Sequence, residues 1–298
     1  MKPGYIDLHI HGFGGYDAQS ANPEVLLHLS KRLGREGLAG FLLTYVSAPK
    51  ASLLRSLAAA RQAMGREKGA RILGVHLEGP FLNPIRRNAH PQGSLRKPSL
   101  TEAKAWLQVM GRNLKVVTLA PELPGAGPVI RFLKSQGIRV QAGHSCATAA
   151  HSRTAQRQGV TGVTHLFNAM GPQDRHEPGL AHYALENRSL YTELIGDGIH
   201  VSDGLLAHTM RNRPLDKIIL VSDNCSASGF SAGHKARFAG GPVVTTQDGS
   251  LRRPNGSLAA SNHSLPRAVN RMIEAGLLKP RQATMLARSN PLSYLANP

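Results

Sequence analysis

Eight short apolar runs recur along the sequence, and amphipathic stretches separate them. The runs span residues 5–11, 40–46, 71–78, 114–119, 138–144, 162–166, 191–195 and 217–223. Short apolar runs that are bounded by Gly or Pro and separated by helical patterns are typical of buried parallel strands. The alternation therefore predicts an α/β fold of repeated strand–helix units, a (β/α)8 TIM barrel. A doubly wound open sheet is the alternative, because the number of strands cannot show whether the sheet closes.

Helix signals in the intervening stretches support this interpretation. Asn22-Pro23 is typical of an N-cap followed by the first helical residue. Ser99 and Glu102 have the spacing of a capping box. After Ser264, apolar residues recur at the spacing of a helix that buries one side.

The chain length of 298 residues fits a single barrel domain over residues 1–298. One stretch departs from the strand–helix pattern, because residues 230–258 are rich in Gly, Ser and Arg. Two short apolar segments in it are joined through Asp248-Gly249, a dipeptide typical of hairpin turns. We therefore expect a small hairpin insertion around residues 235–256.

The charge balance is strongly basic, with 36 Lys and Arg against 18 Asp and Glu and a formal net charge of +18. Such an excess indicates either a solvated basic surface or an anionic partner, such as nucleic acid, a membrane surface or a phosphorylated small molecule. The basic residues are spread along the chain, and aromatic residues make up only 5% of it, too few for a base-stacking platform. Nucleic-acid binding is therefore the weakest of these interpretations.

The sequence also predicts a compartment. It has no uninterrupted apolar stretch of the length that a membrane-spanning helix needs, and its first residues lack the apolar core of a signal peptide. Two cysteines cannot form a disulfide-rich scaffold. We expect a cytoplasmic protein without a membrane partner.

Polar side chains with metal-binding chemistry gather at the ends of the predicted strands. The carboxyl ends of the strands meet at one face of a barrel, where barrel active sites lie. Imidazole nitrogen and carboxylate oxygen suit Zn²⁺, Fe²⁺, Co²⁺ or Mn²⁺. A single histidine at a strand end is more often packed than ligating, but a whole set of such residues predicts a metal site. The set is His9, His11, Glu78, His144, His165 and Asp223.

Longer motifs make the sequence similar to a known family. They occur in order between about residues 3 and 292 and include Asp7-Leu8-His9-Ile10-His11-Gly12, Gly74-Val75-His76-Leu77-Glu78-Gly79-Pro80-Phe81, Thr164-His165-Leu166-Phe167-Asn168-Ala169-Met170 and Val221-Ser222-Asp223. Together they resemble the N-acetylglucosamine-6-phosphate deacetylases of the amidohydrolase superfamily. The resemblance implies a metal-dependent barrel enzyme, a hydrolase that acts on a linear amide.

The resemblance also implies which residues hold the metal. Glu78, His144 and His165 would be the core ligands of a divalent cation. His9 and His11 match the branch of the family that holds a second cation, so one or two ions per subunit are expected.

The implied reaction removes acetate from N-acetylglucosamine 6-phosphate and leaves glucosamine 6-phosphate. A metal-bound hydroxide would attack the acetamide, because a divalent cation lowers the pKa of bound water to about 7. By resemblance, Asp223 would be the general acid/base and His90 would orient or polarise the acetamide carbonyl. Proton transfer by a positioned carboxylate suits this chemistry.

The substrate phosphate would be bound, by resemblance, by His200 and by the chain around Asn168 and Ala169. The family usually has an arginine, which reaches a neighbouring subunit, at the position of His176. Arg175 lies one residue away, so both are candidates for the phosphate contact. Members of the family are commonly homodimers, so the resemblance implies a homodimer as the oligomeric state.

The sequence departs from the family pattern in its extent. Family members usually carry a small β-sandwich built from segments outside the barrel, and both segments are absent here. The leading hypothesis is therefore a barrel-only deacetylase. Two alternatives stay open: an amidohydrolase that acts on another N-acyl sugar or a cyclic amide, and a non-catalytic barrel-only homologue.

Overall fold

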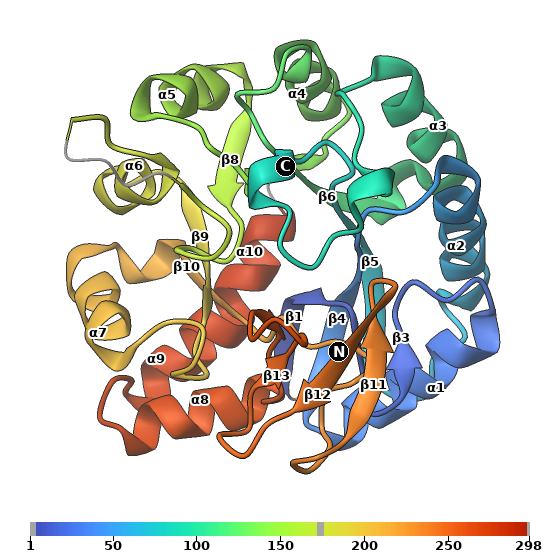
Figure 1. The fold of residues 1–298 in the computed structure, drawn as a ribbon, viewed down its shortest axis with the longest axis vertical. Coiled ribbons are helices and arrows are strands. Elements are labelled where there is room, and N and C mark those ends of the chain that lie inside the picture. Colours follow the sequence, from blue (N-terminus) through green and yellow to red (C-terminus); the bar gives the residue numbers. More distant parts are fainter. Residues whose placement is uncertain (1–3, 172–175, 297–298) are drawn as a thin grey trace.

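The computed structural model describes residues 4–171 and 176–296, and it contains the predicted barrel (Figure 1). Eight strands pair in one parallel sheet, and they follow one another around it in chain order. They are β1 (Tyr5–Ile10), β4 (Leu38–Tyr45), β5 (Arg71–Glu78), β6 (Leu114–Leu119), β7 (Arg139–Ala142), β8 (Val160–Val163), β9 (Tyr191–Ile195) and β10 (Ile218–Val221). The strand–helix alternation read from the sequence is thus confirmed as a (β/α)8 barrel.

The seam between the first and last strands closes just beyond the carboxyl end of β10. The Asp223 backbone N–H donates to His9 O at 2.9 Å, and the His11 N–H donates to Asn224 O at 2.7 Å. Backbone bonds therefore hold three of the predicted site residues together across the seam.

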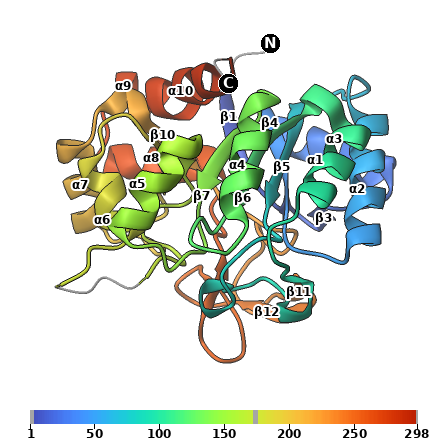
Figure 2. The ribbon, with the colours of Figure 1, turned by 90° about the horizontal axis from the view of Figure 1, so that it is seen from above.

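Helices surround the sheet on its outer side, apart from the last one, which lies across one end of the barrel (Figures 1 and 2). They are α1 (Pro23–Arg35), α2 (Lys50–Ala63), α3 (Leu100–Met110), α4 (Ala126–Ser135), α5 (Ala149–Gln158), α6 (Leu180–Glu186), α7 (Asp203–Asn212), α8 (Leu265–Glu274), α9 (Pro280–Thr284) and α10 (Asn290–Ala296), with a π-helical turn (Met285–Ser289) before α10. No helix among residues 4–171 and 176–296 is long and apolar enough to cross a membrane.

Two of the predicted helix starts differ in how they are capped. The Asn22 side chain accepts the Glu24 N–H at the start of α1. At the start of α3, the Ser99 hydroxyl accepts the Glu102 N–H, but the Glu102 carboxylate lies 2.6 Å from Arg96 Nη2. Only half of a capping box therefore forms, because the Glu102 carboxylate pairs with Arg96 instead.

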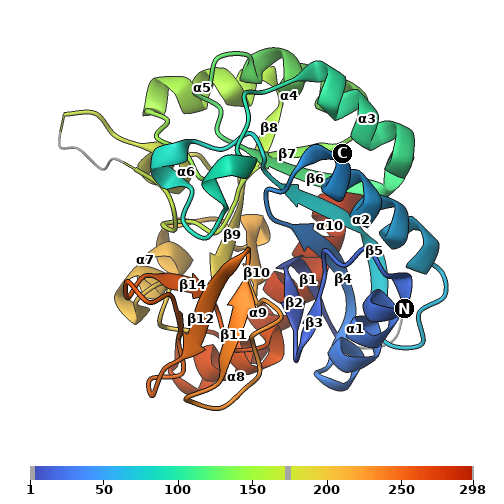
Figure 3. The same ribbon diagram turned by 45° about the vertical axis from the view of Figure 1, so that its right-hand side comes forward.

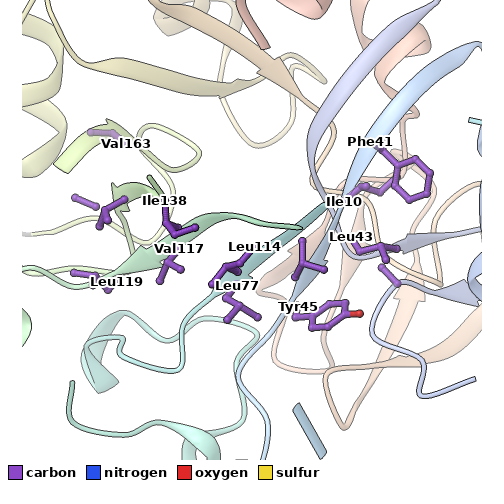
Figure 4. Packing of buried hydrophobic residues seen from close by; sticks show 14 of the residues in the cluster. Ile10, Phe41, Leu43, Tyr45, Leu77, Leu114, Val117, Leu119, Ile138 and Val163 are labelled. Carbon is purple, nitrogen blue, oxygen red and sulfur yellow. The ribbon is translucent and has the colours of Figure 1, made fainter. Parts of the chain in front are cut away.

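Buried side chains form one core on each face of the sheet. The larger cluster includes Phe41, Leu77 and Val117 and packs the sheet against the helices (Figure 4). The smaller cluster includes Leu42 and Val116 from the alternate positions of the same strands. Since neighbouring residues of a strand point to opposite faces, the smaller cluster fills the barrel interior. Tyr294 of α10 joins it.

Two small antiparallel sheets sit beside the barrel. The first pairs β2 (Gly12–Phe13) with β3 (Tyr16–Asp17) through Gly14 and Gly15, whose φ angles of 57° and 91° suit glycine.

The second small sheet comprises β11 (Lys235–Phe238), β12 (Gly241–Thr245), β13 (Leu251–Arg252) and β14 (Leu258–Ala260). β12 and β13 pair around the Asp248-Gly249 turn, and the sheet extends on both sides of them. Figures 2 and 3 show this sheet at the end of the barrel opposite α10.

Candidate active site

The strand ends bring the predicted metal-binding side chains into one cluster. His9 lies in β1, His11 follows that strand, and Glu78 is the last residue of β5. His144 and His165 each lie two residues beyond the end of a strand, and both have left-handed backbone conformations, with φ angles of 48° and 30°. Such conformations are uncommon for residues other than glycine and concentrate at functional sites.

Glu78 is the centre of the cluster. Its Oε1 lies 2.9 Å from Nε2 of both His144 and His165 and 3.4 Å from Nε2 of His9. Its Oε2 faces the other side, 3.4 Å from His11 Nε2 and 3.0 Å from His90 Nε2. The carboxylate therefore separates the surrounding imidazoles into two groups.

Hydrogen bonds at the far ring nitrogens orient two of these imidazoles as ligands. His144 Nδ1 lies 2.7 Å from Arg86 O, and His11 Nδ1 lies 3.2 Å from Thr44 O. A carbonyl oxygen can only accept, so each neutral ring carries its proton on Nδ1. The Nε2 lone pairs then face Glu78, as metal binding requires.

His9 follows the same rule with a carboxylate instead of a carbonyl. Its Nδ1 lies 2.9 Å from Glu193 Oε2. Pairs of Nε2 atoms also face each other closely, at 3.2 Å for His9 and His11 and 3.1 Å for His144 and His165. Lone pairs that converge on one carboxylate are a donor set for a divalent cation, so the residues fit the metal that the sequence predicts.

In His90 the two ring nitrogens have the opposite roles to those in His9, His11 and His144. Its Nδ1 accepts the Ser47 backbone N–H at 3.0 Å, and the Ser47 hydroxyl lies 2.9 Å away. Because Nδ1 accepts, a neutral ring carries its proton on Nε2 and directs an N–H into the site. Burial lowers the pKa of His90 to about 4, so the ring is neutral near pH 7. His90 is therefore a hydrogen-bond donor here and not a ligand.

The electrostatics of the cluster favour the charged form of its acids. Burial by itself would raise the pKa of Glu78, but His9, His144 and His90 hold it well below its ordinary value. Burial would also raise the pKa of Asp223, and the hydrogen bond from His11 together with nearby histidine charge lowers it instead. Both carboxylates are thus available as acceptors near pH 7.

A cavity of about 190 Å³ opens onto this cluster. Phe238 of β11 lines it from above, with its ring 5.4 Å from that of His11. The predicted site residues that line it are His11, Glu78, His90, His144, His165, Asn168, His200 and Asp223. His9 lies beneath them and is fully buried.

Two predicted phosphate contacts are not among the residues that line this cavity. Ala169 does not line the cavity, and its carbonyl accepts the Ser145 N–H at 3.1 Å. His176 is exposed and is not among the lining residues. Arg175 lies outside the described residues.

Two buried acids of the site escaped the sequence analysis. Glu193 lies within the apolar run 191–195, and Asp197 was assigned no role. In the structure Glu193 binds His9, and Asp197 Oδ2 lies 2.7 Å from His200 Nδ1. The available signal was an acid in the middle of a buried strand, since charged residues are rarely buried unpaired.

Comparisons with known proteins agree with this geometry. The amidohydrolase family profile matches residues 1–275. An N-acetylgalactosamine-6-phosphate deacetylase from Escherichia coli O157:H7 is 35% identical over 296 residues, which cover 99% of this chain and 78% of the relative. An N-acetylglucosamine-6-phosphate deacetylase from Bacillus subtilis is 36% identical over 265 residues, which cover 88% of this chain and 66% of the relative.

The solved structures show the same likeness in three dimensions. A mutant N-acetyl-D-glucosamine-6-phosphate deacetylase from Mycobacterium smegmatis, in complex with N-acetyl-D-glucosamine-6-phosphate, matches with a TM-score of 0.90 and 32% identity. The match covers 99% of this chain and 78% of that one. The chain thus spans about three-quarters of the length of this neighbour.

Proposed function

The chain belongs to the amidohydrolase family, and we propose that it is the hydrolase that converts N-acetylglucosamine 6-phosphate to glucosamine 6-phosphate and acetate. One observation carries the proposal: the Nε2 atoms of four imidazoles, the Asp223 carboxylate and the His90 N–H gather around Glu78 at one cavity. A hydrolase of amides needs each of these three elements, namely a cation site, a proton acceptor and a donor for the developing oxyanion.

The metal site is proposed to use Glu78, His144, His165, His9 and His11. A divalent cation bound there supplies a Lewis acid that polarises the carbonyl and makes water acidic. Zn²⁺, Fe²⁺, Co²⁺ or Mn²⁺ suit nitrogen and carboxylate ligands. We further propose that Glu78 can serve two ions, because its two oxygens face different groups of histidines.

Asp223 moves the proton in this scheme. Its Oδ1 lies 3.3 Å from His11 Nε2 and 3.6 Å from His9 Nε2. The Asp223 carboxylate is therefore next to two of the proposed metal ligands. With its pKa lowered, the ionised carboxylate accepts the proton of the attacking water. It then returns that proton to the amide nitrogen, which becomes the amino group of glucosamine 6-phosphate when the bond to acetate breaks.

His90 stabilises the charge that develops on the acetamide oxygen. Its Nε2–H lies at the cavity wall, where it is donated to Glu78 Oε2 at 3.0 Å in this structure, and the Ser47 backbone N–H fixes the ring orientation. A preorganised donor of this kind contributes more to the transition state than to the ground state.

His200 and Asn168 are the proposed contacts to the substrate phosphate, because both line the cavity. Burial would lower the pKa of His200, but Asp197 raises it above its ordinary value, which favours the cationic ring. Arg175, His176 and the Ala169 backbone stay proposals for the same phosphate, as do the homodimer and the cytoplasmic location expected from the sequence.

The test is acetate release with three substrates, together with metal analysis. We expect bound divalent metal and turnover of N-acetylglucosamine 6-phosphate, with much weaker turnover of N-acetylglucosamine. N-acetylgalactosamine 6-phosphate is the third substrate, since one similar protein bears that name. A metal-loaded protein that releases no acetate from N-acetylglucosamine 6-phosphate would overturn the proposal.

A further inference from the structure

A chain of hydrogen-bonded polar side chains crosses the barrel interior beneath the metal cluster. Its members come from β5, β6, β7 and β9 and from the end of β8, and each is at most 1% exposed. Their strand neighbours belong to the outer core, so these side chains point inwards. The members, called the polar chain below, are His76, Thr118, Thr164, Gln141 and Glu193.

The contacts of the polar chain are short and continuous. His76 Nε2 lies 2.7 Å from Thr118 Oγ1, which lies 2.7 Å from Thr164 Oγ1. Thr164 Oγ1 lies 2.7 Å from Gln141 Oε1, and Gln141 Nε2 lies 3.0 Å from Glu193 Oε1. Buried polar groups without a partner are costly, so this continuity constrains where every proton can be.

Glu193 determines the direction of all these bonds. An ionised carboxylate only accepts, so Gln141 must turn its Nε2 towards Glu193 and its Oε1 towards Thr164. Thr164 must then donate to Gln141, and Thr118 must donate to Thr164. His76, at the end, must donate from Nε2 to the Thr118 hydroxyl at 2.7 Å, and its single proton is then not available to Leu8 O, which lies 3.2 Å from Nδ1.

The other oxygen of Glu193 meets a metal ligand. Its Oε2 accepts the His9 Nδ1–H at 2.9 Å, which leaves the His9 Nε2 lone pair facing Glu78. We propose that Glu193 is a positioning residue that holds His9 in its ligating tautomer, and that the polar chain keeps both carboxylate oxygens in place. This inference rests on the metal site of the proposed function, because it concerns how the His9 ring is held in the tautomer that can bind a cation there.

The substitution E193Q separates this role from simple packing, since Gln has nearly the same shape. The amide presents one acceptor and one donor, so it cannot accept from both His9 and Gln141. In one outcome the amide nitrogen faces His9, whose proton then moves to Nε2 and blocks ligation. In the other, Gln141 turns, the whole polar chain reverses, and His76 carries its proton on Nδ1, which lies 3.2 Å from Leu8 O.

Two measurements test the proposal. The first is ¹⁵N NMR of the histidine rings in the metal-free protein, at a pH alkaline enough for His9 to be neutral, since burial would lower the pKa of His9 but Glu78 and Glu193 raise it well above its ordinary value. There we expect His9 as the Nδ1–H tautomer and His76 as the Nε2–H tautomer, and in E193Q one of these two rings must change tautomer. The second is Zn²⁺ titration against a chromophoric chelator. E193Q should weaken binding by about 10- to 100-fold where His9 is the ring that changes, as for other partners of ligating histidines, and should bind Zn²⁺ about as tightly as the wild type where the polar chain reverses instead.

The matched control is E186Q. Glu186 is exposed and pairs with His182 on the surface of α6, so the same change of chemistry there should leave Zn²⁺ affinity and both tautomers unaltered.

The proposal is overturned if wild-type His9 carries its proton on Nε2, or if neither His9 nor His76 changes tautomer in E193Q. The wild-type tautomers decide the question even if E193Q does not fold. A wild-type protein that shows the expected tautomers but releases no acetate would contradict the proposed function and leave the role of Glu193 supported.

Discussion

Asp197 Oδ2 lies 2.7 Å from His200 Nδ1, and both side chains are buried at the edge of the site cavity. Asp197 Oδ1 also accepts the backbone N–H groups of Ile199 and His200, each at 2.9 Å. Burial by itself would lower the pKa of His200, but the hydrogen bond and charge of Asp197 raise it above its ordinary value. The ring is thereby prepared as a cation for the substrate phosphate.

Asp197→Asn should weaken recognition of the phosphate. Without the carboxylate, His200 loses the hydrogen bond and the charge of Asp197 that raise its pKa, so the cationic form of the ring is less favoured. We expect KM for N-acetylglucosamine 6-phosphate to rise about tenfold, the loss of roughly one charge-assisted hydrogen bond, with a smaller change in kcat. Turnover of the unphosphorylated sugar is the control and should not change.

The same pair predicts a pH dependence of binding. The raised pKa of His200 means that its charge is fully present below the ordinary pKa and is lost as pH rises through the raised one. In the wild type, KM for the phosphorylated sugar should therefore increase on the alkaline side. A KM profile that is identical in wild type and Asp197→Asn would contradict this role.

Asp223→Asn should keep the metal and lose most turnover. The amide cannot accept a proton from water, and general-base catalysis contributes about 10²- to 10⁴-fold. Metal analysis beside kcat measurement checks both parts. Wild-type-like activity in this variant would refute the assignment of Asp223.

His90→Leu should lower kcat about 10²- to 10³-fold, the cost of losing one oxyanion donor. Metal content should stay unchanged, because the ring directs an N–H, and not a lone pair, into the site. His90→Gln, which retains an N–H donor, is the matched variant and should lose less. Loss of metal in both variants would instead make His90 a ligand.

Chelation of the metal should abolish activity and lower Tm reversibly. A ligand that binds only the folded state stabilises it by about 4 kcal/mol when its concentration is about a thousand times its Kd. Calorimetry with and without added Zn²⁺ measures the shift, and activity should return with the metal. Full acetate release after exhaustive chelation would exclude a metal-dependent mechanism.

Arg213→Leu should destabilise the fold without touching the site. The buried guanidinium donates to the backbone carbonyls of Ala184, Asn187 and Leu190, which join α6 to β9. Leaving these acceptors unpaired should cost about 3 kcal/mol of unfolding free energy, measured by urea denaturation. Arg211→Leu, at an exposed position of α7, is the control and should change stability little.

The apolar runs and the strand-end residues were enough to predict the barrel and its metal cluster. Parallel strands place their carboxyl ends at one face, so His9, Glu78 and His144 had to meet once each run was recognised as a strand. The start of α1 was also predicted correctly, because the capping side chain of Asn22 acts within its own turn and depends on no distant residue.

The prediction was weaker where a residue's role depends on a distant partner. Glu193 is a single acid in an apolar strand and Asp197 a single acid just beyond it, and the sequence near them does not show which histidine each one meets. His176 is exposed, and its predicted role depends on a neighbouring subunit, so it stays a prediction.

By itself, then, the sequence determined the fold and the ligand types, because hydrophobic periodicity and side-chain chemistry are local properties. Only the tertiary structure decided which ring nitrogen of each histidine faces the site. That choice depends on what the other nitrogen meets: Glu193 accepts from His9, while the Ser47 backbone N–H donates to His90. These partners lie far apart in sequence and are fixed by strand register and loop packing, and they make one imidazole a ligand and the other a hydrogen-bond donor.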